Sequence, residues 1–274
     1  MKKISLALLK CLIVFIVFLI FLGIKYIRIK NASEILDLSQ PKVSIVMPTY
    51  NRASFLMLRT LDSVVNQTYK NYEFIIINDG STDLTSYILD FYMRADSRIK
   101  VIDNEKNLGV IASANKGLDY ATGKYIARID DDDPAYINRL EEQVKFMEEN
   151  QNVDVSATLV SELNNDEAVD CWGNDFSEEG IKKRIYEGIA PFSNSSVMIK
   201  RDFLEKNNIR YNPEWRYLED VIFFYDIAEA GGNFAIIPKV LMRYRFHRSN
   251  PIEYYQEQAE NSIKWRKMLE ERYK

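Results

Sequence analysis

Four consecutive carboxylates, Asp130–Asp133, are the most chemically distinctive stretch of this 274-residue chain. They follow a short apolar run, residues 123–129, and precede Pro134, which can open a helix at its first position. Four adjacent negative charges repel one another unless solvent, a cation or basic groups offset them. Oxygen ligands of this kind suit a hard divalent ion such as Mg²⁺ or Mn²⁺, which would bridge to phosphate oxygens. A solvated acidic loop or an acidic helix N-terminus is the plainer alternative.

The composition is that of a globular protein with a large core. Hydrophobic residues make up 47% of the chain and aromatic residues 12%, which argues against disorder. The net charge of −4 gives no electrostatic reason to expect a nucleic acid as partner. Of the two cysteines, Cys11 and Cys171, the first lies in an apolar N-terminal run, so we expect a reducing compartment and no disulfide framework.

Residues 1–30 are expected to be a membrane anchor. The chain carries no charge from Cys11 to Ile24, and its apolar character extends back to Ile4 with only Lys10 interrupting. The uncharged core is shorter than the about 20 residues of a spanning helix, but a snorkelling Lys10 would extend it. The residues after the run are poor for signal-peptide cleavage, which favours an uncleaved anchor. Basic residues balance on the two flanks, so the orientation stays open.

After a polar linker, residues 31–41, apolar runs alternate with stretches of helical spacing. The runs predict strands at 43–47 (ended by Pro48), 73–77, 99–102 and 123–129. Gly80 permits a tight turn after the second strand, and Ser81 or Thr82 is the expected cap of the next helix. This alternation is typical of an α/β fold with a mostly parallel sheet and helices on both faces.

The second half of the chain is less regular. We expect helices at 136–147 and 221–230, strands at 153–160, 195–199, 234–237 and 240–244, and a charged helix at 251–274. Tyr255, Ile263 and Met268 are the candidate contacts of that last helix. Residues 164–190 have weak periodicity, which predicts a variable, substrate-facing segment.

The ends of the first four strands should converge on one edge of the sheet. In open α/β sheets, ligands bind beyond the carboxyl ends of the strands. Each of these strands ends in a polar cluster, so Asp79 and Asp130–Asp133 should reach a shared ligand. No G-x-G-x-x-G follows the first strand and no G-x-x-x-x-G-K-[ST] occurs, which argues against a dinucleotide dehydrogenase and a P-loop enzyme.

With these motifs in order, the chain resembles the family 2 glycosyltransferases of the GT-A fold over roughly residues 42–250. The motifs are Val43–Arg52, Asn78–Asp83, Asn107–Gly109, Asn115–Gly117, Ala127–Asp133, Ser196–Lys200, Leu218–Asp220 and Tyr244–His247. Each alone is weak, but the ordered set is specific. The resemblance implies a Rossmann-like GT-A domain between the membrane helix and the C-terminal helix.

The resemblance also implies roles for individual residues. Asp130-Asp131-Asp132 matches the family's D-x-D motif, with Asp132 as direct metal ligand and Asp130 on the ribose or a metal-bound water. Asp220 matches the aspartate of an E-D motif that serves as general base, and His247 a histidine that in related enzymes reaches the metal or the diphosphate. The implied donor-binding residues are Pro48, Thr49, Asn51, Arg52, Asp79, Asn107, Arg128, Asp130 and Asp131.

Two positions depart from the family's pattern. Ala114 stands where many relatives carry Arg, and Asn194 where many carry His. Neither change removes the D-x-D motif or the base. The sugar specificity therefore stays open.

The implied reaction moves a sugar from a nucleoside-diphosphate sugar to a hydroxyl of a saccharide or lipid-linked acceptor. Mg²⁺ or Mn²⁺ would neutralise the leaving diphosphate, and one carboxylate would take the acceptor's proton. A single base implies inversion, because a covalent retaining route needs a separate nucleophilic carboxylate. The expected setting is synthesis of cell-surface polysaccharide or glycolipid.

Other functions stay open. A sugar-phosphate nucleotidylyltransferase would carry a Gly-rich basic loop where this chain has Pro48-Thr49-Tyr50-Asn51. An inactive nucleotide-sugar-binding protein would not need Asp130, Asp132 and Asp220 intact. A haloacid-dehalogenase phosphatase places its D-x-D after the first strand, not the fourth. Cytosolic nucleotide sugars favour the cytoplasmic face of a bacterial inner membrane, and a lumenal domain behind the anchor is the alternative.

Overall fold

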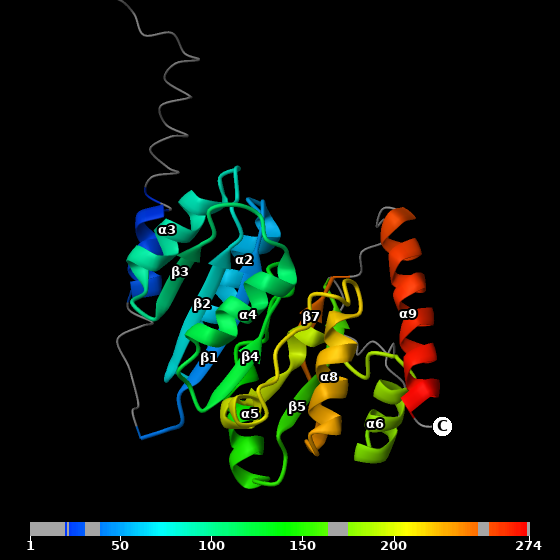
Figure 1. The fold of residues 1–274 in the computed structure, drawn as a ribbon. Coiled ribbons are helices and arrows are strands. Elements are labelled where there is room, and N and C mark those ends of the chain that lie inside the picture. The colour runs from blue at the N-terminus through cyan, green and yellow to red at the C-terminus, as the bar shows by residue number, and fades with distance from the viewer. Residues whose placement is uncertain (1–19, 21, 31–38, 164–174, 246–251, 273–274) are drawn as a thin grey trace, which may run out of the picture.

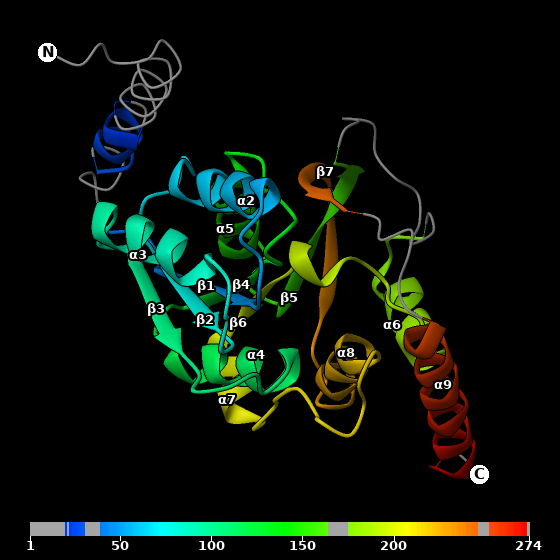
Figure 2. The same ribbon diagram turned by 90° about the horizontal axis from the view of Figure 1, so that it is seen from above.

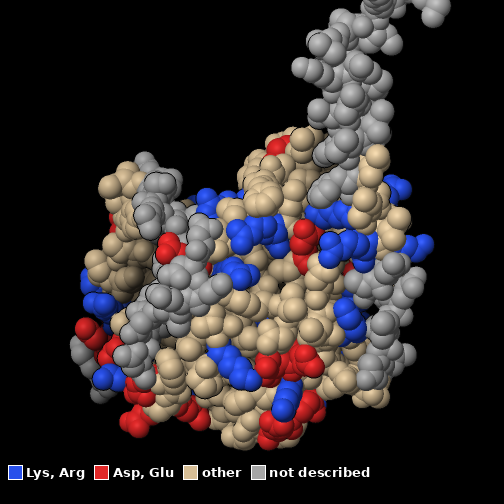
Figure 3. Space-filling model, turned by 180° about the vertical axis from the view of Figure 1, so that it is seen from behind, with Lys and Arg blue, Asp and Glu red and all other residues tan. Residues whose placement is uncertain are grey.

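The computed structural model describes residues 20, 22–30, 39–163, 175–245 and 252–272. Within these ranges no helix combines the length and the apolar character needed to cross a membrane. Most of the expected anchor, residues 1–30, lies outside them, as do Cys171 and His247. On the face shown in Figure 3, lysine and arginine side chains are interspersed with acidic ones.

Within the described residues, seven strands form one sheet in the order β3-β2-β1-β4-β6-β5-β7 (Figure 1). The strands are β1 Val43–Thr49, β2 Tyr72–Asn78, β3 Ile99–Asp103, β4 Tyr125–Arg128, β5 Val155–Glu162, β6 Met198–Lys200 and β7 Phe234–Tyr244. β1 to β4 pair in parallel, and so do β5 and β7. Only β6 among these seven runs antiparallel to its neighbours, β4 and β5. The expected mostly parallel α/β sheet is confirmed.

Helices cover both faces of the sheet (Figure 2). They are α2 Phe55–Val65, α3 Thr85–Ala95, α4 Val110–Tyr120, α5 Arg139–Glu149, α6 Glu178–Tyr186, α7 Arg201–Lys206, α8 Glu219–Glu229 and α9 Ile252–Arg272, with a 3₁₀ turn η1 at Asn194–Ser196. Residues 22–30 form a further helix beside α3 (Figure 1).

Alternate residues of β1 belong to two different hydrophobic clusters. Ile45 and Met47 pack with α2, α3 and α5, whereas Val46 packs with α4 and α8. A strand buried on both faces is apolar throughout, which is why the first strands read as continuous apolar runs. Gly117 lets α4 approach the sheet closely, because a Cβ there would lie 2.3 Å from Val46 Cγ1.

The register aligns the ends of the first strands. Thr49 at the end of β1 lies opposite Asn78 at the end of β2, and Asn78 lies opposite Asp103 at the end of β3. The polar residues that follow these strands therefore start at one edge of the sheet.

Several local predictions were wrong. Pro48 lies inside β1 instead of ending it, and it is tolerated because pairing with β4 stops at Val46. The expected cap of α3 by Ser81 or Thr82 is absent from the described contacts, and the Thr85 amide donates to Asp83 Oδ1 at 2.9 Å instead.

The second half of the chain departs further from the elements predicted for it. The start of the strand expected at 195–199 is the turn η1, and the two short strands expected at 234–244 are one strand, β7, whose register with β5 shifts around Leu159. In α9, Tyr255 and Ile263 are 47% and 57% exposed, whereas Met268 packs against the core. The buried residue of that helix is Trp265.

Candidate active site

A cavity of about 1130 Å³ opens beyond the carboxyl ends of β1, β2 and β4. Its lining includes every site residue predicted from the sequence that lies within the described residues: Pro48, Thr49, Asn51, Arg52, Asp79, Asn107, Arg128, Asp130, Asp131, Asp132 and Asp220. His247 falls outside those residues, so its predicted role stays a prediction. The structure thus brings the D-x-D match and the expected base to the same cavity.

Asp79 holds the loop that forms one wall of this cavity. Its Oδ1 accepts from the Leu108 amide at 2.9 Å and from Asn104 Nδ2 at 2.7 Å, and its Oδ2 accepts from the Gly109 amide at 2.8 Å. Gly80 has φ +70°, and a Cβ there would lie 2.5 Å from the Lys106 carbonyl carbon. Two loops meet at this glycine, so Asp79 positions Asn107 as well as lining the cavity.

Asp131 faces β1. Its Oδ2 accepts from Thr49 Oγ1 at 2.7 Å, and its Oδ1 lies 3.2 Å from Arg52 Nε. Burial raises the pKa of the Asp131 carboxyl to about 7, although Arg52 and Thr49 oppose that shift. Asp131 therefore fastens the loop after β1 to the loop after β4.

Asp130 points towards the open cavity, and its side chain is 41% exposed. Its Oδ1 lies 3.2 Å from Arg128 Nη2, and its Oδ2 accepts from Ser195 Oγ at 2.7 Å. Arg128 is buried, its Nη1 donates to the Val46 carbonyl at 3.0 Å, and its Nε has no hydrogen-bond partner among the described residues. A buried guanidinium beside Asp130 offsets part of the charge of the four-carboxylate run.

Ser195 joins two of the carboxylates. Its hydroxyl lies 2.7 Å from an oxygen of Asp130 and 2.7 Å from Asp133 Oδ2. One hydroxyl has one proton, so it donates to only one of them. Burial and the charges of Asp130 and Asp132 raise the pKa of Asp133 well above its ordinary value. A protonated Asp133 that donates to Ser195 Oγ, while Ser195 donates to Asp130, satisfies both contacts.

Asp132 is paired with two arginines. Its Oδ2 lies 3.2 Å from Arg245 Nη1 and 3.6 Å from Arg52 Nη2. The backbone amide of Arg245 also donates to Asp133 Oδ1 at 2.9 Å. Arg245 directly follows β7, and the sequence analysis did not single it out. Basic side chains therefore offset these carboxylates in the structure.

The donor chemistry of this cluster fits a hard divalent cation. Among the described residues, no three His, Cys, Asp or Glu side chains are arranged around one point as metal ligands. Mg²⁺ is, however, commonly held by one or two carboxylates together with water and substrate phosphates. Asp130 and Asp132 supply such carboxylates at the cavity wall.

Arg139 supports the same region from within the core, and sequence reasoning missed it. Its Nη2 donates to the carbonyls of Arg128 at 2.8 Å and Val197 at 3.1 Å, and its Nε donates to Gln143 Oε1 at 2.9 Å. Burial lowers the pKa of its guanidinium to about 9. The i, i+4 spacing of Arg139 and Gln143 on an otherwise apolar helix face was the available signal.

Two acidic side chains, Glu219 and Asp220, begin α8 on the other side of the cavity. Asp220 Oδ1 accepts from the Val221 amide at 2.8 Å, and burial raises the pKa of its carboxyl. Burial and the neighbouring Asp220 raise the pKa of Glu219 to about 7, and its Oε2 has no hydrogen-bond partner in the described structure. The nearby Arg216 lies with its Nη1 3.8 Å from Glu257 Oε2.

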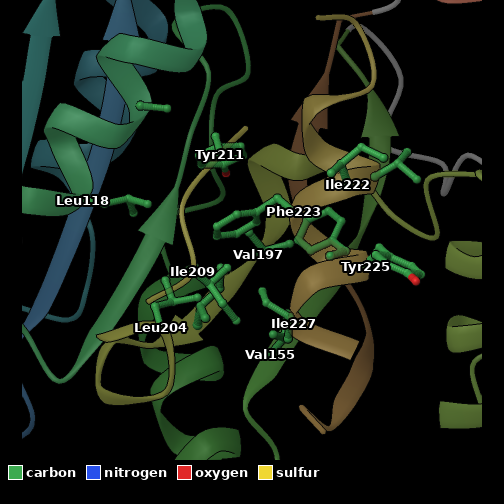
Figure 4. Packing of buried hydrophobic residues seen from close by; sticks show 14 of the residues in the cluster. Leu118, Val155, Val197, Leu204, Ile209, Tyr211, Ile222, Phe223, Tyr225 and Ile227 are labelled. Atoms are coloured by element: carbon green, nitrogen blue, oxygen red, sulfur yellow. The ribbon is translucent and has the colours of Figure 1, made fainter. Parts of the chain in front are cut away.

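Aromatic packing fixes α8. The rings of Tyr211 and Phe223 stack with centroids 4.1 Å apart, one turn beyond Asp220 (Figure 4). Ile222 and Ile227 of the same helix pack among the core residues of this half (Figure 4). The position of Asp220 is therefore set by a buried helix rather than by a loop.

The remaining wall of the cavity comes from α9 and the segment after α6. Ile189 lines it from the segment after α6, and Tyr255, Gln258 and Ser262 line it from α9. Tyr217, just before α8, lines the cavity as well. Trp265 anchors α9, because its ring packs edge-on against Tyr225 at 4.5 Å and Trp215 at 5.4 Å. The sequence predicted a helix here but not that it forms part of the site.

The two departures from the family pattern also line the cavity. Ala114 is buried on α4, and Asn194 Oδ1 accepts from the Tyr211 hydroxyl at 3.3 Å.

Comparison with known proteins identifies the family. The model described as "Glycosyl transferase family 2" matches residues 44–207. An uncharacterized glycosyltransferase of Haemophilus influenzae is 30% identical over 233 residues, which cover 82% of this chain and 71% of the relative. A putative teichuronic acid biosynthesis glycosyltransferase of Bacillus subtilis is 40% identical over 110 residues, 40% of this chain and 43% of that protein.

Two solved structures share the fold at low sequence identity. S. aureus TarS in complex with UDP-GlcNAc has a TM-score of 0.66 and 20% identity, covering 81% of this chain and 66% of that one. A mannosyltransferase from Pyrobaculum calidifontis in complex with GDP-Man and Mn²⁺ has a TM-score of 0.64 and 18% identity, covering 89% of this chain and 70% of that one. The fold is thus GT-A-like, and the chain belongs to glycosyltransferase family 2.

Proposed function

We propose that this glycosyltransferase moves a sugar, with inversion, from a nucleoside-diphosphate sugar to a hydroxyl of a saccharide or lipid-linked acceptor. The observation that carries the proposal is that the Asp130–Asp133 run and Asp220 line one cavity from different parts of the fold. The nucleotide sugars in the two solved structures support the donor class. The teichuronic acid relative supports a role in cell-surface polysaccharide or glycolipid synthesis.

The donor binds, in this proposal, at the ends of β1, β2 and β4. Pro48, Thr49, Asn51, Asp79 and Asn107 contact the nucleoside. Asp130 and Asp132 hold Mg²⁺ or Mn²⁺, which when bound neutralises the charge of the leaving diphosphate. The Mn²⁺ in the mannosyltransferase structure supports this choice of ion.

Three arginines complete the diphosphate site. Arg52 and Arg245 pair with Asp132, and Arg128 pairs with Asp130. A divalent cation bound to Asp130 and Asp132 would supply the positive charge that the arginines supply here. The guanidinium groups are then available to the phosphate oxygens, which suit their planar, multidentate donors.

Asp220 acts as the general base. As the acceptor oxygen forms its bond to the anomeric carbon, the bond from that carbon to the diphosphate oxygen breaks and the acceptor proton passes to Asp220. Burial raises the pKa of Asp220, which makes its carboxylate a better proton acceptor. One base and one displacement invert the anomeric centre.

Residues 1–30 anchor the protein to the cytoplasmic face of a bacterial inner membrane, where cytosolic nucleotide sugars are supplied. The uncharged run Cys11–Ile24 supports this proposal. His247 is proposed to reach the metal or the diphosphate.

A thermal-shift screen of nucleotide sugars, with and without Mn²⁺, tests the proposal. A ligand that binds only the native state raises its apparent stability, so we expect one class of donor to raise the Tm only when Mn²⁺ is present. Release of nucleoside diphosphate from that donor then tests the chemistry. A chain that responds to no nucleoside-diphosphate sugar, or that releases no diphosphate from one it binds, contradicts the proposal.

A further inference from the structure

The helix of residues 22–30 is docked on the domain. Tyr26 packs edge-on against Phe91 with ring centroids 6.1 Å apart, and its hydroxyl donates to the Arg94 carbonyl at 3.0 Å. Lys25 Nζ lies 3.1 Å from Asp62 Oδ2 of α2. Ile29 is buried. Contacts with both α2 and α3 hold this helix in one orientation against the domain.

The N-terminal end of this helix faces the edge of the sheet at which the cavity opens (Figure 1). The helix lies beside α3 with its N-terminal end up, and the first turns of α3 lie at the same end (Figure 1). β1 starts at the opposite end and ends near the cavity. The apolar sequence that precedes residue 25 runs into this docked helix with no polar linker between them. The end of the docked helix that adjoins this apolar sequence therefore lies at the same edge of the sheet as the cavity.

Three large apolar side chains stand exposed at the same edge. Phe55, Leu84 and Tyr87 are 74%, 65% and 76% exposed. Phe55 begins α2, and Leu84 and Tyr87 lie at the start of α3. We call these three residues the apolar rim.

Hydrogen bonds hold the two helix starts together. The Arg52 amide donates to Thr85 Oγ1 at 2.8 Å, and the Ala53 amide donates to Asp83 Oδ2 at 3.0 Å. The hydrogen bonds hold the starts of α2 and α3 together, so the three side chains of the apolar rim form one surface. Large exposed apolar side chains that gather at one place mark protein or membrane contacts.

The docked helix adds a second apolar strip. Ile24 and Ile27 are 56% and 59% exposed, and their i, i+3 spacing places them on one side of the helix. Ile20, two residues before the helix, is 56% exposed. A helix with a buried face, an exposed isoleucine face and basic residues towards its C-terminal end (Arg28 and Lys30) is suited to the boundary of a bilayer.

We propose that the apolar rim contacts the lipid bilayer that holds residues 4–24, so that the cavity opens towards the membrane surface and takes a membrane-borne acceptor. This rests on the membrane anchor of the proposed function. The occupant is lipid because the sequence directly before the docked helix is itself an apolar run of the kind that lipid accommodates. A second copy of the chain is the other occupant that the experiment detects.

The test uses the full-length chain in vesicles of phosphatidylcholine and phosphatidylglycerol. In a Cys11→Ser, Cys171→Ser background, an environment-sensitive fluorophore is attached at Leu84→Cys. A matched label at Lys124→Cys, an exposed position in the turn before β4, reports on the opposite end of the sheet. We expect blue-shifted emission and quenching by spin-labelled lipids at position 84, with water-like emission at position 124.

Each other outcome overturns the proposal. Water-like emission at position 84 in a chain that floats with the vesicles shows that the apolar rim does not contact lipid. A blue shift that spin-labelled lipids do not quench assigns the rim to a second copy. A chain that does not float with vesicles rejects the anchor, and a donor-induced thermal shift in that chain would leave the donor site standing.

A triple variant, Phe55→Ser/Leu84→Ser/Tyr87→Ser, tests the side chains themselves. Its anchor is unchanged, so it should still float with vesicles, and its donor-induced thermal shift should match wild type. A fluorophore at Leu108→Cys, an exposed position on the neighbouring loop, should lose most of its lipid quenching in the triple variant. Quenching equal to that of the parent chain shows that the apolar rim does not carry the contact.

Discussion

The carboxylates on the two sides of the cavity, at the end of β4 and at the start of α8, have different surroundings. At the end of β4, Asp130 and Asp132 lie beside the arginines Arg128, Arg52 and Arg245. At the start of α8, burial raises the pKa of Glu219 and Asp220, and among the described contacts no arginine or lysine pairs with either. The first arrangement suits exchange of one cation for another, and the second suits uptake of a proton. The difference supports the proposed division of roles, with charge neutralisation at β4 and proton transfer at α8.

The largest effect should come from the proton-transfer half. Asp220→Asn keeps the shape of the side chain but removes its proton-accepting oxygen, so transfer should fall by roughly 10²–10⁴-fold. Donor affinity should stay near wild type, because the contacts of the β4 half are intact. Transfer rate and donor Kd are measured together. Near-normal transfer by Asp220→Asn, or a larger loss in Glu219→Gln, would reverse the assignment of the two acidic residues.

The second effect concerns the stability of the α8 half. Trp265→Ala removes a fully buried ring that holds α9 against Tyr225 and Trp215, and it should lower the free energy of unfolding by about 3–5 kcal/mol. Urea unfolding followed by circular dichroism measures the loss. Ile263→Ala, at an exposed position of the same helix, is the control. Equal stability of the two variants would mean that α9 is not part of the folded core.

The charge-neutralising half is tested by Asp132→Ala. Removal of a metal ligand should lower the Mn²⁺-dependent affinity for a nucleoside diphosphate by at least the 10–100-fold that outer-sphere changes cause. Titration calorimetry with and without Mn²⁺ measures it. Asp133→Asn is the matched control, since an amide can replace a protonated acid beside Ser195, and it should bind as wild type does. Unchanged Mn²⁺ dependence in Asp132→Ala would remove this residue from the metal site.

The smallest effect is a change in the pH dependence of stability. Glu219 has an ordinary pKa of 4.5 and a folded-state pKa of about 7. Between these values the folded chain keeps a proton that the unfolded chain has lost, so stability falls as the pH rises through this window. Glu219→Gln lacks this titration, and its Tm should fall less than that of wild type between pH 5 and pH 8. Parallel Tm curves would mean that Glu219 ionises normally.

The sequence predicted the β1–β4 half well because its signals are local. Each strand is a short apolar run, each run ends in polar residues, and parallel pairing puts those ends in register. Asp79 and Asp130–Asp133 could be placed at one edge from these facts alone. The position of Pro48 inside β1 could not be predicted in the same way. It depends on where the pairing between β1 and β4 ends, and no local sequence pattern shows that.

The rest of the site could not be predicted in this way, because it is built by contacts between residues that are far apart in the sequence. Ser195 meets Asp130 and Asp133 across 65 and 62 positions, and the amide of Arg245 reaches Asp133 across 112. Trp265 lies in a helix that is otherwise mostly charged and polar, and Arg139 lies at the start of α5, where a charged side chain is usually exposed. Burial decides the role of both, and burial follows from tertiary packing rather than from sequence spacing.

The antiparallel strand β6 has a consequence for engineering. β6 lies between β4 and β5 in the sheet, and Ser195 lies just before it. The residues from β5 to Arg245 can therefore not be exchanged independently of the β1–β4 half. A chimera that takes residues 155–245 from a relative replaces both partners of Asp133. These are Ser195, whose hydroxyl lies against the Asp133 carboxyl, and Arg245, whose amide donates to it. Recombination between relatives is therefore expected to preserve activity only when the residues at 133, 195 and 245 come from the same parent.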